Sequence, residues 1–371
     1  MKNENSILLI TDYAAPYEGN FIESIKVLHY SLEKNNNKIV YLFPKRAKKL
    51  YWINDLIREK EFVIYFFNDD TYFNLRKTIK DILKKESINI IYTHFCRHKT
   101  QLAVKITRIF NSKIKLVSHF HNHCKVNGSF IKRSFMKIAY KLYEGDLNIG
   151  CSESVQKSMP YKLSKTTYVE NAIDFKRLDN YRNIEIKGIE NKFVILMFGF
   201  DYYRKGVDLA TKAIKKLNNP NITLAISLAS NREKVEDSIK KEIGRIPEFV
   251  SFLDPINDVA TYYRKSDLFL SAAREEGFCY SIVEAAYCKT NILSSNIPGV
   301  PKKIPGEYLF ESGNYLDLAE KIKMIYKEKY KKKNDKENDK ILKDAKDFVQ
   351  KEYDLKIWAD EIVLKLLSSE A

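Results

Sequence analysis

The sequence predicts an α/β protein with two doubly wound, Rossmann-like domains that face each other across a cleft. Short apolar runs alternate with amphipathic stretches in two consecutive series, and this pattern is typical of parallel sheets covered by helices on both faces. The chain of 371 residues is also too long for one small core. The polar segment 179–192 separates the two series and marks the predicted domain boundary.

The expected strands of the first series are the runs SILLITD, NKIVYLF, EFVIYFF, INIIYTH, IKLVSHF and LNIGCS. Helical periodicity lies between them, as in FIESIKVLHYSLEK and FNLRKTIKDILKKE. The second series offers KFVILMFGF, NITLAISLA, EFVSFLD, DLFLSAA and TNILSS, each followed by a helix-like segment.

We therefore expect an N-terminal domain over residues 1–182 and a C-terminal domain over 183–352. The tail, 340–367, has the pattern of one amphipathic helix. Its last part, 353–371, is expected to pack back onto the N-terminal domain. Residues 327–340 are charged and of low complexity, and they predict a solvated helix extension or loop without a function.

The composition favours a cytoplasmic protein. No apolar run approaches the ~20 residues of a membrane helix, and the first apolar stretch is short and contains Asp12, unlike a signal peptide. The five cysteines are scattered and odd in number, which fits a reducing compartment and not a disulfide framework.

The positive charge is concentrated in the first half of the chain. Residues 1–180 hold a surplus of 13 basic over acidic residues, although the whole chain has a net charge of +16. Between Glu86 and Glu144 there is no acidic residue, and that window contains five of the six histidines. Such a surface attracts an anionic partner: a phosphorylated substrate, an anionic lipid or a nucleic acid.

The segment AAREEGFCYSIVEAAYC, 272–288, places Glu276 and Glu284 eight residues apart at the end of a predicted strand. A helix would separate them by ~12 Å, more than the ~5–9.5 Å between paired hydrolytic carboxylates. We therefore expect the two carboxylates to hold separate parts of one extended ligand. The helix N-terminus between them favours a phosphate, so the spacing suits a nucleotide sugar. The alternative is that Glu276 and Glu284 lie on a solvated helix face and bind nothing.

Several motifs in one order resemble the family-4 retaining glycosyltransferases, which have the two-domain GT-B fold. The run EGFCYSIVEA, followed by SSNIPGVPKKI, resembles the family's Glu-x7-Glu signature. FGFDYYRKGVDLATKAI is similar to its glycine- and lysine-bearing phosphate loop, and YVENAIDFKRL to its Asn-Gly-Ile-Asp segment. IIYTHF and VSHFHN resemble the histidine-bearing strand ends of the acceptor domain, and APYEGNF stands in the place of the N-terminal glycine loop.

The resemblance implies a role for individual residues. Glu284 would bind the ribose hydroxyls of the donor, and Glu276 the hydroxyls of its sugar. Lys205 would neutralise the diphosphate leaving group, and His121 would lie near the anomeric carbon or the acceptor. Gly19 would let the backbone approach the donor. Glu276, Lys205 and His121 are the predicted catalytic residues, and the expected donor-binding residues are Gly19, Arg204, Lys205, Glu276, Gly277, Phe278, Cys279 and Glu284.

The sequence departs from the family pattern at the phosphate loop. The family has an arginine after the loop glycine, whereas this chain has Phe200. We expect Arg204 to supply the missing charge, so that Arg204 and Lys205 replace a metal ion. The prediction is metal-independent transfer without a cofactor, with same-face attack as the resemblance implies. A UDP-sugar is the favoured donor, and the acceptor is a glycan or polyprenyl-linked sugar in cell-surface polysaccharide or glycoconjugate synthesis.

A membrane surface is a further expected partner. Segment 129–146, SFIKRSFMKIAYKLYEGD, interleaves aromatic and basic residues as a cationic amphipathic helix does. The alternative is a core helix with a basic outer face. On the first interpretation the protein is peripheral on the inner face of the membrane.

Four other functions compete with these predictions. The clusters HFCRH and HFHNHC, with His119, His121 and His123 on one strand face, suggest zinc, but their spacing is not that of a standard zinc motif. A nucleic-acid binder lacks the stacking pattern of a single-strand platform, and no partner of that kind is expected. No G-x-G-x-x-G follows a strand, which argues against a dinucleotide-dependent oxidoreductase. A GT-B sugar-nucleotide epimerase is the nearest enzymatic alternative.

Overall fold

The computed structural model divides into two compact units, residues 1–172 with 355–371, and residues 173–354. The two units meet in the sequence at 172/173 and at 354/355. The predicted boundary at 182/183 lies ten residues beyond the first of these positions. The structure describes residues 5–16, 18–68, 71–124, 134, 136, 138, 140–141, 143–160, 163, 165–179, 181, 186, 189, 191–228, 231–254, 258–301, 304–330 and 335–368.

The N-terminal unit is built on a seven-stranded parallel sheet with the order β3-β2-β1-β4-β5-β6-β7. The six predicted strands are confirmed, and a short edge strand, β7, was not predicted. The strands are β1 (Ser6–Thr11), β2 (Lys38–Pro44), β3 (Val63–Phe67), β4 (Ile90–His94), β5 (Lys115–Phe120), β6 (Leu147–Gly150) and β7 (Thr166–Tyr168).

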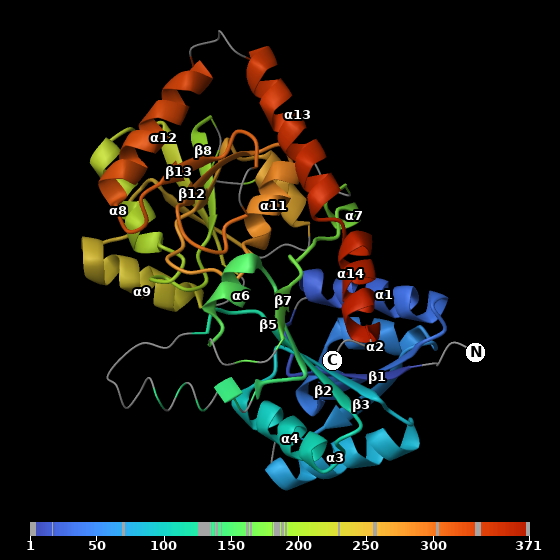
Figure 1. Ribbon diagram of the computed structural model, residues 1–371. Helices are drawn as coiled ribbons and strands as arrows, with labels where there is room; N and C mark the ends of the chain where they lie inside the picture. The colour runs from blue at the N-terminus through green and yellow to red at the C-terminus, as the bar shows by residue number, and fades with distance from the viewer. Residues whose placement is uncertain are drawn as a thin grey trace. The chain divides into compact units, whose positions relative to one another are not determined.

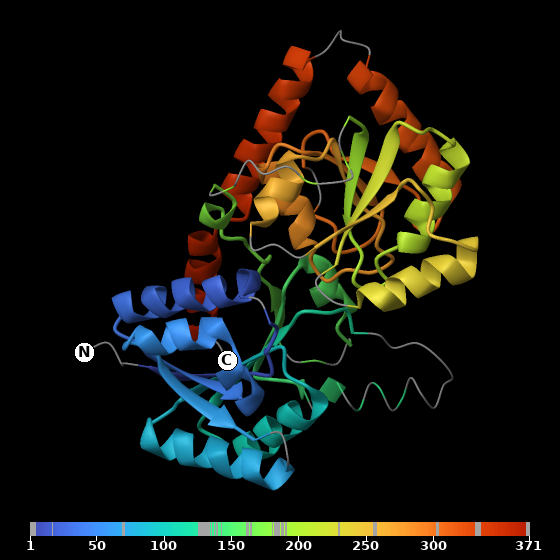
Figure 2. The ribbon, with the colours of Figure 1, turned by 180° about the vertical axis from the view of Figure 1, so that it is seen from behind.

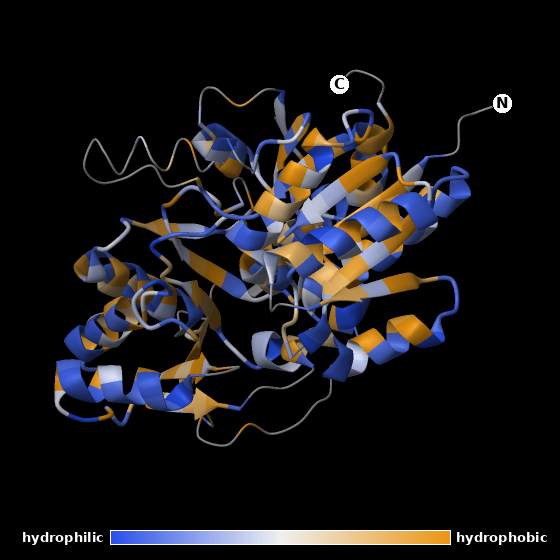
Figure 3. Cartoon of the chain, turned by 90° about the horizontal axis from the view of Figure 1, so that it is seen from below, coloured by the Kyte–Doolittle hydropathy of each residue, from blue (hydrophilic) through white to orange (hydrophobic). Residues whose placement is uncertain are grey.

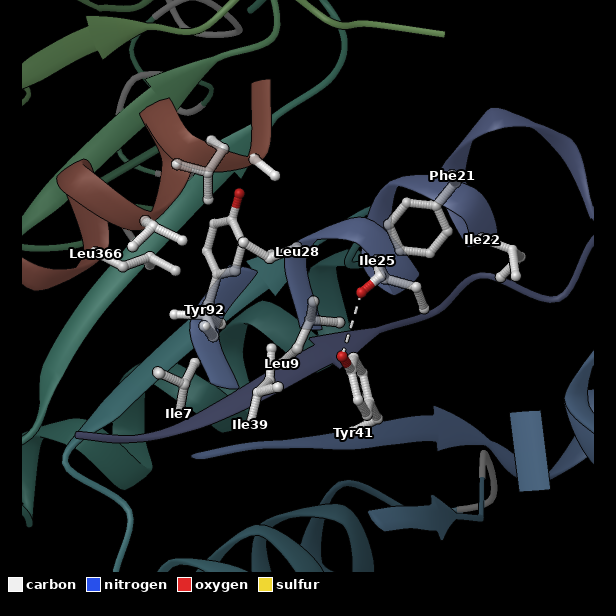
Figure 4. Packing of buried hydrophobic residues seen from close by; sticks show 14 of the residues in the cluster. Ile7, Leu9, Phe21, Ile22, Ile25, Leu28, Ile39, Tyr41, Tyr92 and Leu366 are labelled. Atoms are coloured by element: carbon white, nitrogen blue, oxygen red, sulfur yellow. Dashed lines mark hydrogen bonds between the residues drawn. The ribbon is translucent and has the colours of Figure 1, made fainter. Parts of the chain in front are cut away.

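Alternate residues of these strands enter two different cores, because successive side chains point to opposite faces of a sheet. Ile7 and Leu9 pack with the cluster beneath α1, α2 and α14, whereas Leu8 and Ile10 pack beneath α3 and α4. Figure 4 shows the first cluster, in which the Tyr41 hydroxyl donates to the Ile25 carbonyl at 3.3 Å. The helices of this unit are α1 (Gly19–Lys34), η1 (Lys45–Lys49), α2 (Tyr51–Arg58), α3 (Tyr72–Lys85), α4 (His98–Ile109), α6 (Glu153–Ser158) and α14 (Leu355–Leu367).

The C-terminal unit has a six-stranded parallel sheet with the order β10-β9-β8-β11-β12-β13. Helices α8, α9 and α12 pack on one face, while α11 contacts α10 and α13 on the other side (Figures 1 and 2). The strands are β8 (Phe193–Phe198), β9 (Ile222–Ser227), β10 (Val250–Leu253), β11 (Leu268–Ser271), β12 (Asn291–Ser295) and β13 (Tyr308–Phe310). The helices are α7 (Lys176–Asp179), α8 (Val207–Leu217), α9 (Arg232–Ile243), α10 (Val259–Arg264), α11 (Tyr280–Tyr287), α12 (Tyr315–Tyr330) and α13 (Asp335–Glu352).

The two sheets confirm the predicted fold class of two doubly wound domains. In both units the described helices carry hydrophilic and hydrophobic stripes (Figure 3), as expected for helices that cover a sheet. Within the described parts of the chain, no helix combines the length and the apolar character needed to cross a membrane.

The prediction of one helix over 340–367 is wrong, because the tail forms two helices. α13 ends at Glu352, and α14 begins at Leu355. Between them the Tyr353 carbonyl accepts from the Ile173 backbone N–H at 3.0 Å, and Asp354 forms a parallel bridge with Ile173. This pairing needs extended backbone and therefore interrupts the helix. α13 packs on α11 in the C-terminal unit, and α14 packs on α1 in the N-terminal unit.

The charged segment 327–340 is helical at both ends, where it belongs to α12 and α13, and residues 331–334 lie outside the described part of the chain. Half of the proposed amphipathic segment 129–146 also lies outside the described residues.

Candidate functional site

The predicted donor residues of the C-terminal unit lie after β8 and β11, the two strands at which the order of the sheet reverses. Ligands of doubly wound sheets bind at this switch point, beyond the carboxyl ends of the strands. The loop after β8 carries Arg204 and Lys205, and the loop after β11 carries Glu276. The topology therefore brings together residues that lie about seventy positions apart in the chain.

Lys205 and Glu276 form an ion pair between these two loops. The Lys205 Nζ donates to Glu276 Oε1, and an Arg204 guanidinium nitrogen lies 3.8 Å from the other carboxylate oxygen. Both partners of the Lys205–Glu276 pair are largely shielded from solvent, whereas Arg204 is exposed. Two cations thus converge on one carboxylate, whereas the sequence predicted these cations for a diphosphate and Glu276 for sugar hydroxyls.

Phe200 occupies the position where the resemblance leads one to expect an arginine. Its ring centroid lies 5.2 Å from the Arg204 guanidinium carbon and 4.9 Å from Lys205 Nζ. Both distances are within the range of cation–π attraction. The aromatic ring therefore helps to hold the two cations beside Glu276.

Arg274 connects the same two loops, although it was not among the residues predicted from the sequence. Its guanidinium donates to both carboxylate oxygens of Asp208 at 2.8 and 2.6 Å and to the Tyr203 carbonyl at 2.5 Å. Its backbone N–H donates to the Arg204 carbonyl at 2.9 Å. A bidentate pair of this kind is geometrically specific. No sequence signal marks Asp208 and Arg274 as partners, because they meet only through the sheet order.

Gly206 allows the close approach of the loops. Its φ is +71°, and a Cβ atom there would lie 2.0 Å from the Ala272 carbonyl oxygen. On the other side of the turn, a Cβ at Gly299 would lie 1.9 Å from the Glu276 carbonyl oxygen. Neither position accommodates a side chain, so these two glycines determine how closely the backbone surrounds Glu276.

Glu284 lies on α11 in a different environment from Glu276. It is buried, pairs with the Arg177 guanidinium and accepts from the Tyr263 hydroxyl at 2.8 Å. Burial, and then the Glu284 carboxylate, raise the pKa of the Tyr263 phenol well above its usual value. The phenol therefore remains a hydrogen-bond donor. Arg177 and Tyr263 were not identified from the sequence, although Arg177 lies within the segment quoted for the family resemblance.

The turn between the two glutamates has buried side chains. Phe278 packs against Tyr353, and the Cys279 thiol lies 3.5 Å from Ser271 Oγ and 3.3 Å from Ser281 Oγ. Burial, and then the neighbouring Glu276, raise the pKa of Cys279, so its thiol is not an activated nucleophile. Gly277 lies in the same turn, against Gly299. The Cys279 backbone N–H donates to the Gly299 carbonyl at 3.0 Å, which fixes this turn against the Gly299 loop.

The remaining predicted residues belong to the N-terminal unit. Gly19 begins α1 with a φ of +60°. His121 follows β5, and its ring stacks on Phe95 with centroids 3.8 Å apart. Burial lowers the pKa of His121 to about 3, so the imidazole is neutral near pH 7.

Comparison with known proteins finds a similarity in the C-terminal unit. Residues 179–345 match the model of the family described as glycosyl transferases group 1. The chain has the GT-B fold, and its C-terminal unit is similar to the glycosyl transferases of group 1. The match covers α8, α11 and the loops that hold Lys205 and Glu276.

Curated relatives of this GT-B protein are distant. The GPI3 subunit of phosphatidylinositol N-acetylglucosaminyltransferase from Saccharomyces cerevisiae is 25% identical over 247 residues, which cover 64% of this chain and 54% of the yeast protein. The gpi3 subunit of the same enzyme from Schizosaccharomyces pombe is 20% identical over 316 residues, 80% of this chain and 67% of that protein. The chain thus spans about half the length of the Saccharomyces relative.

Solved structures share the fold over nearly the whole chain. A glycosyltransferase from Rickettsia africae has a TM-score of 0.77 at 18% identity and covers 99% of this chain and 100% of its own. Anabaena HepE, solved in complex with UDP-glucose, has a TM-score of 0.74 at 16% identity and covers 97% of this chain and 99% of its own. At these identities the likeness concerns the fold alone.

Proposed function

We propose that the protein transfers a sugar from a nucleoside-diphosphate sugar, with a UDP-sugar as the favoured donor, to a glycan or lipid-linked acceptor. The observation that carries this proposal is the cluster of Lys205, Arg204 and Glu276 at the switch point of the C-terminal sheet. The names of two similar proteins support it, since one belongs to an N-acetylglucosaminyltransferase and the other was solved with UDP-glucose.

In this proposal the donor rearranges the Lys205–Glu276 pair. A diphosphate beside the loop after β8 competes with Glu276 for Lys205 and Arg204, since phosphate oxygens accept charge-assisted hydrogen bonds from both cations. The carboxylate released from Lys205 then accepts hydrogen bonds from sugar hydroxyls. Charge on the leaving diphosphate grows in the transition state, so fixed cations accelerate its departure. These side chains supply the positive charge, and we expect transfer without a metal ion.

The stereochemical course is a separate part of the proposal. The family-4 resemblance implies retention through attack on the face that the diphosphate leaves, with the departing phosphate oxygen taking the proton of the acceptor hydroxyl. The Cys279 thiol, whose pKa is raised by burial, is not assigned as a covalent nucleophile, and Glu276 is assigned to the sugar hydroxyls. Nuclear magnetic resonance of the product distinguishes retention from inversion through the anomeric coupling constant.

Peripheral attachment to the inner face of the membrane also remains a proposal, with synthesis of a cell-surface polysaccharide or glycoconjugate as its setting. The described residues of the N-terminal unit include three exposed apolar side chains on α3 and α4, namely Phe73 in the first turn of α3 and Ile109 and Phe110 at the C-terminal end of α4. Arg76 and Lys80 lie 4.9 and 6.0 Å from the Phe110 ring. Aromatic side chains bordered by cations suit an anionic lipid surface. We name these five residues the α3–α4 surface.

The test of the donor site is thermal unfolding with UDP, GDP, ADP or dTDP in the presence of a chelator. We expect one diphosphate, UDP, to raise the melting temperature selectively, because a ligand that binds only the folded state stabilises it by about 2.7 kcal/mol at one hundred times its Kd. Lys205→Met is expected to weaken this binding about 10- to 100-fold. Lys212→Met, on α8 and paired with Glu242, serves as the control.

A stabilisation by UDP that is equal in wild type and Lys205→Met would contradict the assigned phosphate site. No stabilisation by any diphosphate at millimolar concentration would contradict donor binding altogether. Incubation with labelled UDP-sugars and no acceptor separates transfer from epimerisation, since an epimerase converts the donor itself.

A further inference from the structure

Three histidine rings meet at the carboxyl ends of β4 and β5 in the N-terminal unit. His94 ends β4, His119 is its register partner on β5, and His121 follows β5. One ring nitrogen of each lies within 4.8 Å of a ring nitrogen of both others. His94 and His119 are only 1% and 4% exposed, and His121 is partly buried.

Each ring in this cluster has a buried nitrogen without a hydrogen-bond partner among the described residues. These atoms are His94 Nε2, His119 Nε2 and His121 Nδ1. An unsatisfied buried polar atom costs about 1–3 kcal/mol, and three in one cluster form an unusual concentration. These three unpartnered nitrogens are an observation from the structure, independent of the histidine pattern in the sequence, and they indicate that the cluster can bind a ligand.

The other ring nitrogens are oriented by neighbours. The Tyr92 hydroxyl lies 2.7 Å from His119 Nδ1, and a hydrogen bond of 2.9 Å joins His121 Nε2 and His94 Nδ1. When both of these rings are neutral, only one of them has a lone pair on its unpartnered nitrogen, so both bind an ion only after the ion displaces this hydrogen bond. When His119 Nδ1–H donates to the Tyr92 oxygen, the lone pair of the imidazole is on Nε2, and a metal-binding histidine is typically oriented by such a hydrogen bond. Tyr92 is itself fully buried.

The surroundings of the cluster are apolar on one side. Phe95 stacks on His121 and has a φ of +49°, a conformation that a bulky side chain rarely adopts and that is found preferentially at functional sites.

We propose that His94, His119 and His121 bind one divalent transition-metal ion of the zinc class. A ligand set of imidazoles without a carboxylate suits zinc, cobalt, nickel or copper and not magnesium or calcium. Three histidine ligands leave the fourth tetrahedral position for water or a substrate atom. The spacing of these histidines matches no standard zinc motif, so no metal was predicted from the sequence. The rings meet through the pairing of β4 with β5.

This ion is independent of the proposed phosphate site, which lies in the C-terminal unit and uses Lys205 and Arg204. If His121 binds the ion, its ring does not contact the donor sugar directly. A direct binding measurement therefore separates the two proposals, because metal affinity does not depend on sugar transfer.

The experiment uses the full chain without an affinity tag, stripped with a chelator and titrated with Co²⁺. Visible absorption reports tetrahedral coordination, and competition with Zn²⁺ gives the zinc affinity. We expect one equivalent of Co²⁺ in the wild type, a loss of affinity of more than about 100-fold in His121→Gln and His94→Gln, and a loss of about 10-fold in Tyr92→Phe. His98→Gln, an exposed histidine on α4, is the matched control and is expected to bind like the wild type.

The absence of a tetrahedral Co²⁺ spectrum in the wild type would overturn the proposal and leave the histidines as a packed cluster of neutral rings. Equal affinity in the wild type and His121→Gln would overturn it as well. His121 is the least buried of the three, so this variant is expected to keep the wild-type circular dichroism. That spectrum separates a lost ligand from a lost fold.

Discussion

At the scale of single residues, Glu276 and Glu284 differ in what surrounds them. Glu276 meets two cations at the edge of the loops, whereas Glu284 is buried between Arg177 and the Tyr263 hydroxyl. A ligand can compete with Glu276 for its two cations. The pairing of Glu284 also contributes to stability, because removing one partner of a buried pair leaves the other charge uncompensated.

Glu284→Gln is therefore expected to lower the free energy of unfolding by about 2 kcal/mol, less than for a fully buried pair because Arg177 is partly exposed. Glu236→Gln removes a carboxylate from an exposed pair with Arg232 on α9 and should cost less than about 0.5 kcal/mol. Urea unfolding of both variants measures the difference. Equal losses would mean that the Arg177–Glu284 pair does not stabilise the unit.

Glu307 gives the C-terminal unit a pH-dependent stability. Burial raises the pKa of this carboxyl to about 7 from 4.5, although Ser294 Oγ donates to it at 2.6 Å. The unfolded chain releases the proton above pH 4.5, while the folded chain keeps it until about pH 7. This group therefore costs little stability at low pH and destabilises the fold increasingly as the pH rises through that window.

Glu307→Gln removes the ionisation and is expected to raise the free energy of unfolding by about 2 kcal/mol more at pH 8 than at pH 5. Unfolding curves at the two pH values measure this, with Glu320→Gln, an exposed position on α12, as the control. A gain that is the same at both pH values would exclude the carboxyl as the cause.

At the scale of elements, two loops form the site because glycine lets them touch. At Gly206 an added Cβ would meet the Ala272 carbonyl, whereas at Gly244, with a φ of +90°, nothing lies within 4 Å of the added atom. Both glycines have a left-handed backbone, but only at Gly206 would an added side chain collide with a neighbour. Comparing substitutions at the two positions therefore distinguishes the cost of backbone strain from the cost of a steric clash.

Gly244→Ala should cost about 1 kcal/mol through backbone strain alone. Gly206→Ala should cost at least about 2 kcal/mol more and should reduce UDP binding, since the loop of Arg204 and Lys205 must move away from Glu276. Thermal unfolding and UDP titration of both variants provide the test. If the two substitutions have the same cost, the contact with Ala272 does not constrain the loop.

At the scale of the whole molecule, the last helix belongs to the first domain. Trp358, Ile362 and Leu366 of α14 lie in the same core as β1 and α1. Trp358→Ala is expected to destabilise the N-terminal unit by about 3–5 kcal/mol, and Leu364→Ala, 70% exposed on the same helix, by less than about 0.5 kcal/mol. Hydrogen exchange measured by peptide reports each unit separately. Uniform loss of protection in both units would show that α14 does not act locally.

The α3–α4 surface provides a test of membrane attachment. Phe73 and Phe110 are 77% and 70% exposed, and replacing both with serine removes apolar area without disturbing the core. We expect the double variant to bind vesicles of anionic phosphatidylglycerol at least about 10-fold more weakly than the wild type, with unchanged melting temperature. Replacing Ile357 and Leu364, exposed on α14, is the control. Equal vesicle binding by all three proteins would exclude this surface as the membrane contact.

The long strands and the two-domain fold were predictable because their physical cause is local. Strands such as β1 and β8 are buried on both faces, so nearly all of their residues are apolar, and this apolar run can be recognised in the sequence. The edge strands β7 and β13 have three residues each, too few for a periodic signal. The break at Tyr353 was invisible for a different reason: its partner, Ile173, is remote in sequence and pairs with it only in the folded chain.

The sequence by itself determined two doubly wound sheets, the loops that carry Lys205 and Glu276, and the concentration of positive charge in the first half. Each follows from periodicity, turn residues or composition within a short window. Only the tertiary structure decided that Arg274 joins these loops through Asp208, that Glu284 is held by Arg177 and Tyr263, and that three histidines share one buried cluster. These contacts depend on strand order and register, which place distant residues within a few ångströms of each other, and no local pattern encodes that distance.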